Sequence, residues 1–179
     1  MYKITLTPHV GVEIEEIGKV NFGDSKEQVK SIWGDYTEIR KGRVEYTQFG
    51  FFADFKDDDT FEAVEFWNYM DEFVSEVYIY GKEVLQNLAV DTLAIIKEKN
   101  GNVDAIEGWF YNIDVIYSGG HPGDFEKIIE QYKQEGTYEE SKDYLEEDYG
   151  KSHYFSTFGI GYKGYCQDGY DELQKILNG

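Results

Sequence analysis

Three histidines and one cysteine are the residues of this 179-residue sequence that most often bind metals or act as nucleophiles. A zinc site needs three or four ligands that converge on the ion. His9, His121 and His153 each stand beside Pro, Gly or Tyr at an expected turn or strand end. No two of them share a helix-face spacing, and the sequence contains no HExxH motif. We therefore expect no metal site and no cofactor.

Nucleophilic catalysis by Cys166 would need a nearby base, and His153 is the only histidine at short range in the sequence. Cys166 lies in a Tyr- and Gly-rich expected strand without a local motif, which favours a buried or half-buried structural thiol. The glycine-rich stretches 118–123 and 159–164 do not follow a strand and open a helix, as a phosphate-binding loop would. With 36 acidic residues some carboxylates are always close, so pairs carry little information. We expect a protein that is not an enzyme.

The charge balance is the most informative bulk property, with a net charge of −19 from 36 acidic and 17 basic residues. This charge disfavours nucleic acids and anionic membranes as partners and favours a cationic protein. The alternative is that the acidity only keeps the protein soluble. The first ten residues lack the features of a secretory signal, and no apolar run reaches membrane-spanning length. These observations predict a cytoplasmic protein.

The stretch 54–76 combines nine carboxylates and six aromatic rings with a single cation, Lys56. This much aromatic surface is enough to fold, so we expect a folded surface that is both negative and rich in rings. A second acidic surface is expected on a helix that begins after Thr137. The candidate partner-binding residues on the first surface are Asp57, Asp58, Asp59, Glu62, Glu65 and Trp67, and those on the second are Glu139, Glu140, Asp143, Glu146 and Glu147.

The hydrophobic pattern alternates between strands and helices along the chain. A capping box of Ser25 and Gln28 opens the first helix, and Gly34 ends it. Thr137 and Glu140 form another such box, and Asp168 can cap a terminal helix. Strands are expected at 2–6, 10–14, in an antiparallel meander over 44–80, and at 105–111, 113–118 and 153–166, with further helices at 82–99 and 124–135.

These elements predict an α+β fold with antiparallel sheets and helices packed on one face. No linker of Ser, Pro or Gly separates domains, so one domain over 1–179 is expected. The order of helix followed by strands occurs at least twice. This order suggests two pseudo-repeated halves, 1–81 and 82–179, that share a sheet.

Two resemblances add to this interpretation. The stretch 18–34 is similar to the short element that opens the helix-plus-sheet repeats of β-lactamase-inhibitor-like and outer-membrane assembly lipoprotein-like folds. The matching residues are Phe22, Gly23, Ser25, Val29 and Gly34. In size, acidity and tyrosine content the chain also resembles the immunity proteins of bacterial contact-dependent and other polymorphic toxin systems. The first resemblance implies a fold, and the second implies a cytoplasmic inhibitor that binds a toxin domain, commonly a basic nuclease.

The sequence thus leads to the hypothesis of a non-enzymatic inhibitor that binds a cationic toxin domain, most simply a nuclease whose substrate charge it mimics. A first alternative is a small-molecule domain, binding or enzymatic, with an aromatic pocket for a sugar or a peptide. A second alternative is an acidic cytosolic protein with a structural or regulatory role. A deep aromatic pocket would favour the first alternative, and an evenly spread charge would favour the second.

Overall fold

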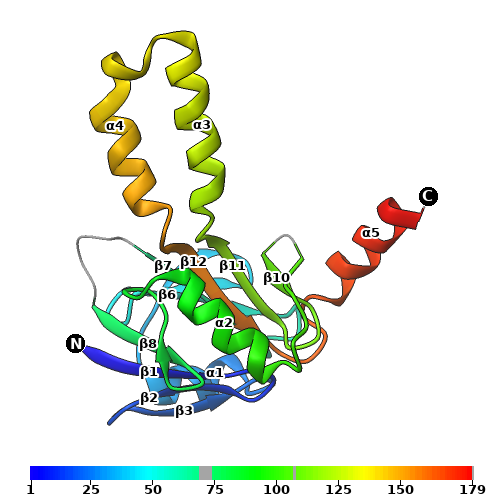
Figure 1. Ribbon diagram of the computed structural model, residues 1–179. Coiled ribbons are helices and arrows are strands. Elements are labelled where there is room, and N and C mark those ends of the chain that lie inside the picture. Colours follow the sequence, from blue (N-terminus) through cyan, green and yellow to red (C-terminus); the bar gives the residue numbers. More distant parts are fainter. Residues whose placement is uncertain (69–73, 107, 179) are drawn as a thin grey trace.

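A computed structural model describes residues 1–68, 74–106 and 108–178 of the chain. The described residues form five helices and two mostly antiparallel sheets, with 33% of the structure helical and 35% in strands. The predicted α+β class is confirmed (Figure 1). Residues 69–73, which belong to the acidic stretch 54–76 and to the meander expected over 44–80, lie outside the described residues.

The smaller sheet has five strands in the order β3-β2-β1-β8-β9. Its first three strands form an antiparallel meander, and β8 pairs in parallel with β1, with Ile4 opposite Val77. The strands are β1 (Tyr2–Thr7), β2 (Gly11–Ile14), β3 (Gly18–Asn21), β8 (Ser75–Ile79) and β9 (Lys82–Glu83). The expectation that 75–79 continues the meander over 44–80 is wrong. An alternating strand fits either sheet equally well, so its pattern could not specify which sheet it joins.

The larger sheet has seven strands in the order β10-β11-β12-β7-β6-β5-β4, all paired antiparallel. This sheet contains strands from both of the predicted halves, 1–81 and 82–179. That the two halves are repeats stays a prediction. Its strands are β4 (Thr37–Arg40), β5 (Arg43–Tyr46), β6 (Phe51–Phe55), β7 (Phe61–Trp67), β10 (Trp109–Phe110), β11 (Val115–Gly119) and β12 (Phe155–Gly161).

Buried side chains of both sheets form one hydrophobic core together with helices α1 (Lys26–Trp33) and α2 (Ala89–Lys99). The predicted capping box of α1 is confirmed, because Ser25 and Gln28 make both reciprocal bonds. The helix buries Trp33, whose ring meets Phe51 edge-on at a centroid distance of 5.2 Å. Each fully buried ring of this kind contributes about 1.5–3 kcal/mol relative to its exposed state.

The helix predicted over 82–99 begins only at Ala89. Tyr80 and Gly81 have positive φ angles of 51° and 79°, so the chain turns back and β9 pairs with β8. The Glu83 carboxylate then accepts the backbone N–H groups of Leu85 and Gln86 at 3.0 and 2.8 Å. These bonds satisfy the backbone N–H groups of residues 85 and 86 outside a helix.

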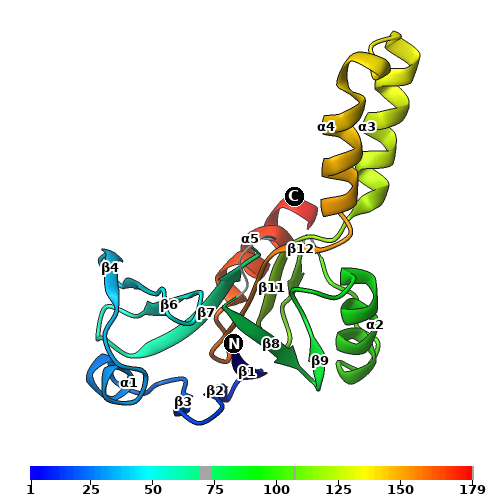
Figure 2. The ribbon, with the colours of Figure 1, turned by 90° about the vertical axis from the view of Figure 1, so that its left-hand side faces the viewer.

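Helices α3 (Pro122–Glu135) and α4 (Tyr138–Lys151) form a hairpin that stands away from the two sheets (Figures 1 and 2). Gly136 ends α3 with a φ of 75°. The capping box predicted for Thr137 and Glu140 is wrong, because the Thr137 side chain makes no capping bond with a described residue. The backbone N–H of Thr137 instead donates to the Tyr132 carbonyl at 3.1 Å, so Thr137 belongs to the closing turn of α3.

The last helix, α5 (Gln167–Asn178), extends from the body on another side (Figure 1). It begins one residue before Asp168, the residue predicted to cap it. None of the described helices is long and apolar enough to cross a membrane.

Candidate protein-binding surface

The outer face of the seven-stranded sheet is the face that points away from the core, and it carries charged and aromatic side chains. Along β5 the buried residues Val44 and Tyr46 alternate with the partly exposed Arg43 and Glu45. The register places Arg43 opposite Asp54, and a second row on the same face joins Glu45, Phe52 and Glu65. Neighbouring strands therefore bring together on this face residues that are distant in the sequence.

Arg43 holds two carboxylates on the outer face. Its guanidinium donates to Asp54 at 3.1 Å and to Glu65, and it lies 4.7 Å from the centre of the Phe52 ring. Burial raises the pKa of Asp54 more than the Arg43 charge lowers it. The cluster is thus a partly dehydrated charge network with a fixed geometry.

Three of the predicted residues lie on this face. Glu62 lies at an irregularity of the β6–β7 pairing, where burial and then the Asp54 charge raise its pKa. Glu65 is bound to Arg43, and Trp67 is 44% exposed with its ring 6.0 Å from that of Phe52. The combination of Trp, Arg and dehydrated carboxylates is common among the residues that dominate protein interfaces.

The Asp57–Asp59 turn lies at the opposite end of β7 from Trp67, and its polar groups make local bonds. Asp58 accepts the Thr60 hydroxyl at 2.6 Å, and Asp57 pairs with Lys41 at 2.8 Å. Asp59 has a φ of 58°, as the tight turn requires. These three residues shape the hairpin turn, and the structure does not bring them together with Trp67.

The C-terminal segment covers one end of the outer face. The Tyr165 ring lies against Gly161, where an added Cβ would be only 2.3 Å from the ring. Burial raises the pKa of the Tyr165 hydroxyl, and the charges of Asp54 and Glu62 raise it further. The end near Trp67 lies next to the helical hairpin, because Trp67 is opposite Thr157 at the start of β12.

The second predicted surface lies on α4 of the projecting hairpin. Glu139 and Glu140 lie in the first turn of α4, where carboxylates interact favourably with the helix dipole. Glu147 bonds to Lys151 at 2.5 Å, which lowers the pKa of Glu147. Fourteen helical residues span roughly 20 Å, so Glu139 and Glu140 lie at the end of α4 far from β12, whereas Glu146 and Glu147 lie near the end that leads into it. The remaining predicted residues of α4 are Asp143 and Glu146, and Glu146 accepts the Tyr138 hydroxyl at 3.1 Å.

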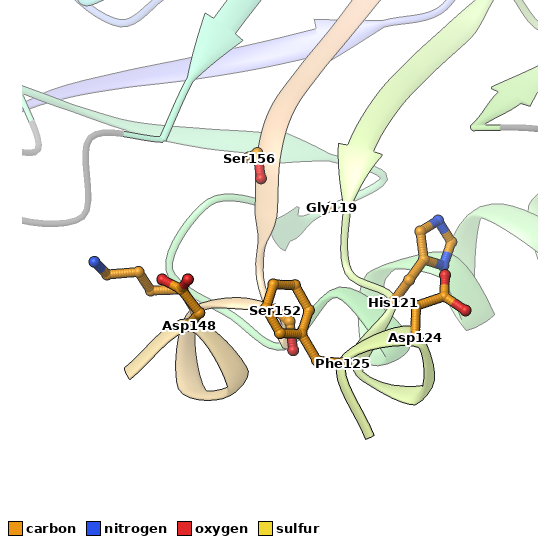
Figure 3. A pocket seen from close by; sticks show the side chains of 8 residues that line it. Gly119, His121, Asp124, Phe125, Asp148, Ser152 and Ser156 are labelled. Carbon is orange, nitrogen blue, oxygen red and sulfur yellow. The ribbon is translucent and has the colours of Figure 1, made fainter. Parts of the chain in front are cut away.

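A cavity of about 370 Å³ lies at the base of the hairpin, and no motif in the sequence predicted it. Figure 3 shows side chains of both helices and of the adjoining strands around this hairpin-base cavity. The short Gly136–Thr137 connection, which makes antiparallel helices neighbours, was the one available indication. The lining residues are Gly119, His121, Asp124, Phe125, Asp148, Lys151, Ser152 and Ser156.

A second cluster, buried and distant in sequence, surrounds Asp114. This carboxylate is 2% exposed and accepts the backbone N–H groups of Gly164 at 2.8 Å and Cys166 at 2.7 Å. It also lies 2.8 Å from the Nε2 atom of His9, whereas His153 packs against Tyr149. The cluster joins the β1–β2 turn to the seven-stranded sheet.

Cys166 is fully buried, as predicted for a structural thiol. Burial, followed by the Asp114 charge, raises the pKa of the Cys166 thiol, which disfavours the reactive thiolate. Among the described residues, no group of three or more His, Cys, Asp and Glu side chains could hold a metal ion. We assign the Asp114 cluster a role in stability.

Comparison with protein-family models, with curated proteins and with solved structures gives no match.

Proposed function

We propose that this chain is a non-enzymatic inhibitor that binds a cationic protein. The observation that carries the proposal is the projecting α3–α4 hairpin, whose residues 122–151 contain ten carboxylates and four lysines. Within the described structure, α3 has no fully buried residue and α4 has only Leu145. A hairpin that contributes so little to the core is better explained as a surface for a partner.

The charge by itself does not select this surface. Residues 1–60, 61–120 and 121–179 carry twelve, eleven and thirteen carboxylates against eight, three and six Lys or Arg residues. This even distribution is what the alternative of an acidic regulatory protein predicts. The shape of the hairpin and the aromatic outer face favour a specific partner over general acidity.

A small-molecule site receives less support from the geometry. The three cavities described have volumes of about 370, 320 and 330 Å³ and are open to solvent. Ligand pockets typically range from about 300 to 1,000 Å³ and enclose most of the ligand. These cavities are at the lower end of that range, and they suit a side chain of a protein partner.

The type of partner follows from the resemblance to immunity proteins, which bind and block a toxin domain. In this proposal the acidic surface occupies the position of nucleic acid on a basic toxin nuclease and accelerates encounter with it. The chain would act in the cytoplasm, where such a toxin has its substrate.

The test is capture of a partner from the source organism at low salt, followed by a wash at about 0.5 M salt, which shortens screening to a few ångström. The proposal expects one basic protein in near-equal amount that is toxic when expressed alone and harmless when co-expressed with this chain. Scattered basic proteins that are lost in mild salt would contradict it and favour the regulatory alternative.

Charge reversal then tests the hairpin with a matched control. Glu139→Lys with Glu140→Lys should slow association about tenfold at low salt. Asp171→Lys with Glu172→Lys changes two exposed carboxylates of α5 and alters the net charge equally. Equal slowing by both pairs would show that only net charge matters.

A further inference from the structure

The two sides of the seam between α3 and α4 differ in how they are closed. On one side the Tyr149 hydroxyl donates to Glu126 at 3.1 Å, and Lys133 lies 5.2 Å from the centre of the Tyr138 ring. These contacts cover that side with polar side chains. We call the other side the Tyr144 seam and define it by Phe125, Ile128, Tyr132, Tyr144 and Asp148.

The Tyr144 seam exposes apolar surface in the middle of the hairpin. Ile128 is 40% exposed and Tyr144 is 65% exposed. Phe125, Ile128 and Tyr132 follow one another at three- and four-residue spacing, so they form a stripe along α3. The Tyr144 hydroxyl is hydrogen-bonded to Asp148, which raises the pKa of Tyr144 and holds its ring on α4 beside this stripe.

Carboxylates outnumber lysines on the open side of the seam. At 100° per residue, Lys133 and Lys142 point to the closed side. Lys151, which pairs with Glu147 at 2.5 Å, and Lys127, which pairs with Asp124 at 2.9 Å, place two cations on the open side. The carboxylates that the same geometry places beside the Tyr144 seam are Asp124, Glu135, Glu140, Glu147 and Asp148.

The hairpin-base cavity continues the Tyr144 seam at its lower end. Phe125 and Asp148 belong to both, and Asp124 adds a second carboxylate from α3 (Figure 3). The Ser152 and Ser156 hydroxyls also line the cavity. An apolar stripe with mainly acidic margins therefore ends in a space of about 370 Å³, which Asp124 and Asp148 line together with His121 and Lys151.

We infer that the Tyr144 seam binds a basic amphipathic helix of the cationic partner. The helix would place its apolar stripe on Ile128 and Tyr144 and its Lys or Arg residues against the acidic margins, which would complete a three-helix bundle. A second copy of this chain is a poor occupant, because two chains of charge −19 repel each other. This inference rests on the proposed function and names the recognition site.

The experiment uses the full chain and two synthetic probes of about 20 residues, an amphipathic Lys/Leu helix and an oligolysine of equal charge. Backbone NMR at low and at moderate salt would locate each probe on the protein. We expect the amphipathic peptide to shift resonances of α3 and α4 around the Tyr144 seam and to remain bound at moderate salt. We expect the oligolysine to shift acidic residues broadly and to dissociate at moderate salt.

The variant for this test combines Ile128→Ser with Tyr144→Ser, and the control is Val90→Ser on α2, where Val90 is 64% exposed. We expect the double variant to bind the amphipathic peptide at least about tenfold more weakly than wild type does. We expect the control to bind within about twofold of wild type. Thermal unfolding would verify that both variants fold, as exposed positions predict.

Three results would overturn the inference: equal binding by the double variant and wild type, shifts confined to the outer sheet face, or a dimer of the free chain through the seam. In each case capture of a toxic basic protein could still succeed, so the failure of this inference is separable from failure of the proposed function.

Discussion

Leu145 offers the sharpest test of whether the hairpin is an independent unit. It is 2% exposed and is the single fully buried residue that the structure describes in α3 and α4. The sheets, in contrast, share a core of many fully buried side chains. We therefore expect Leu145→Ala to open the hairpin locally while the sheets remain folded.

The size of the effect follows from the site. Replacing a buried Leu by Ala costs about 2–5 kcal/mol, and the cost is lowest where the surroundings can collapse or admit water. Phe125 and Ile129 of α3 are only partly buried, so the hairpin interior lies close to solvent. We expect a loss of about 2–3 kcal/mol in the free energy of hairpin opening, which corresponds to about 30- to 150-fold faster amide exchange.

Hydrogen exchange resolved along the chain measures this change. Amides of α3 and α4 should exchange faster in Leu145→Ala, whereas those of β6, β7 and β12 should keep their wild-type rates. Val64→Ala provides the contrast. Val64 is fully buried in β7, so this substitution should destabilise the sheets. Equal acceleration in hairpin and sheets by Leu145→Ala, or none in the hairpin, would refute the view that the hairpin is a separate unit.

Three further predictions concern the body of the protein. Asp114→Asn should lower the free energy of unfolding by about 1–3 kcal/mol, because one of the buried N–H groups of Gly164 and Cys166 loses its acceptor; urea unfolding would detect it, and an unchanged midpoint would contradict it. Cys166 should react with a thiol reagent only as fast as the protein unfolds, and rapid labelling of the native protein would contradict its burial. Burial raises the pKa of Asp54 above its ordinary value of about 3.9. In the pH window between these two pKa values, the native state binds more protons than the unfolded state does. Stability should therefore fall as pH rises through that window, and Asp54→Asn should remove this component from a series of urea midpoints.

Local sequence rules predicted those elements whose determinants are local. The start of α1 was predicted from the three-residue spacing of Ser25 and Gln28, and in the structure these two residues bond to each other. The Thr137 and Glu140 pair has the same spacing, but the chain conformation at Thr137 is set by the turn that closes α3. The spacing therefore indicates a cap only where the neighbouring chain allows the cap residue to adopt the capping conformation.

Long-range contacts could not be predicted from one sequence. The Asp114 carboxylate meets His9 across 105 positions, and no local pattern encodes that pairing. On the outer face, Glu65 and Trp67 share a side of β7 because strands alternate, which a sequence can indicate. Their neighbour Arg43 arrives through register, which a sequence alone leaves open.

The carboxylates and the apolar residues of the surface should act at different steps of binding. Charge over the whole molecule raises the rate of encounter with a cationic partner, and the carboxylates nearest the contact contribute most, although no single one should dominate affinity. Residues that exclude water at the contact, such as Ile128 and Tyr144, act after encounter and should control dissociation. Reversal of Glu139 and Glu140 should accordingly lower the association rate and its salt dependence, whereas serine at the Tyr144 seam should raise the dissociation rate. A serine variant that slowed association and left dissociation unchanged would mean that charge, and not the seam, holds the partner.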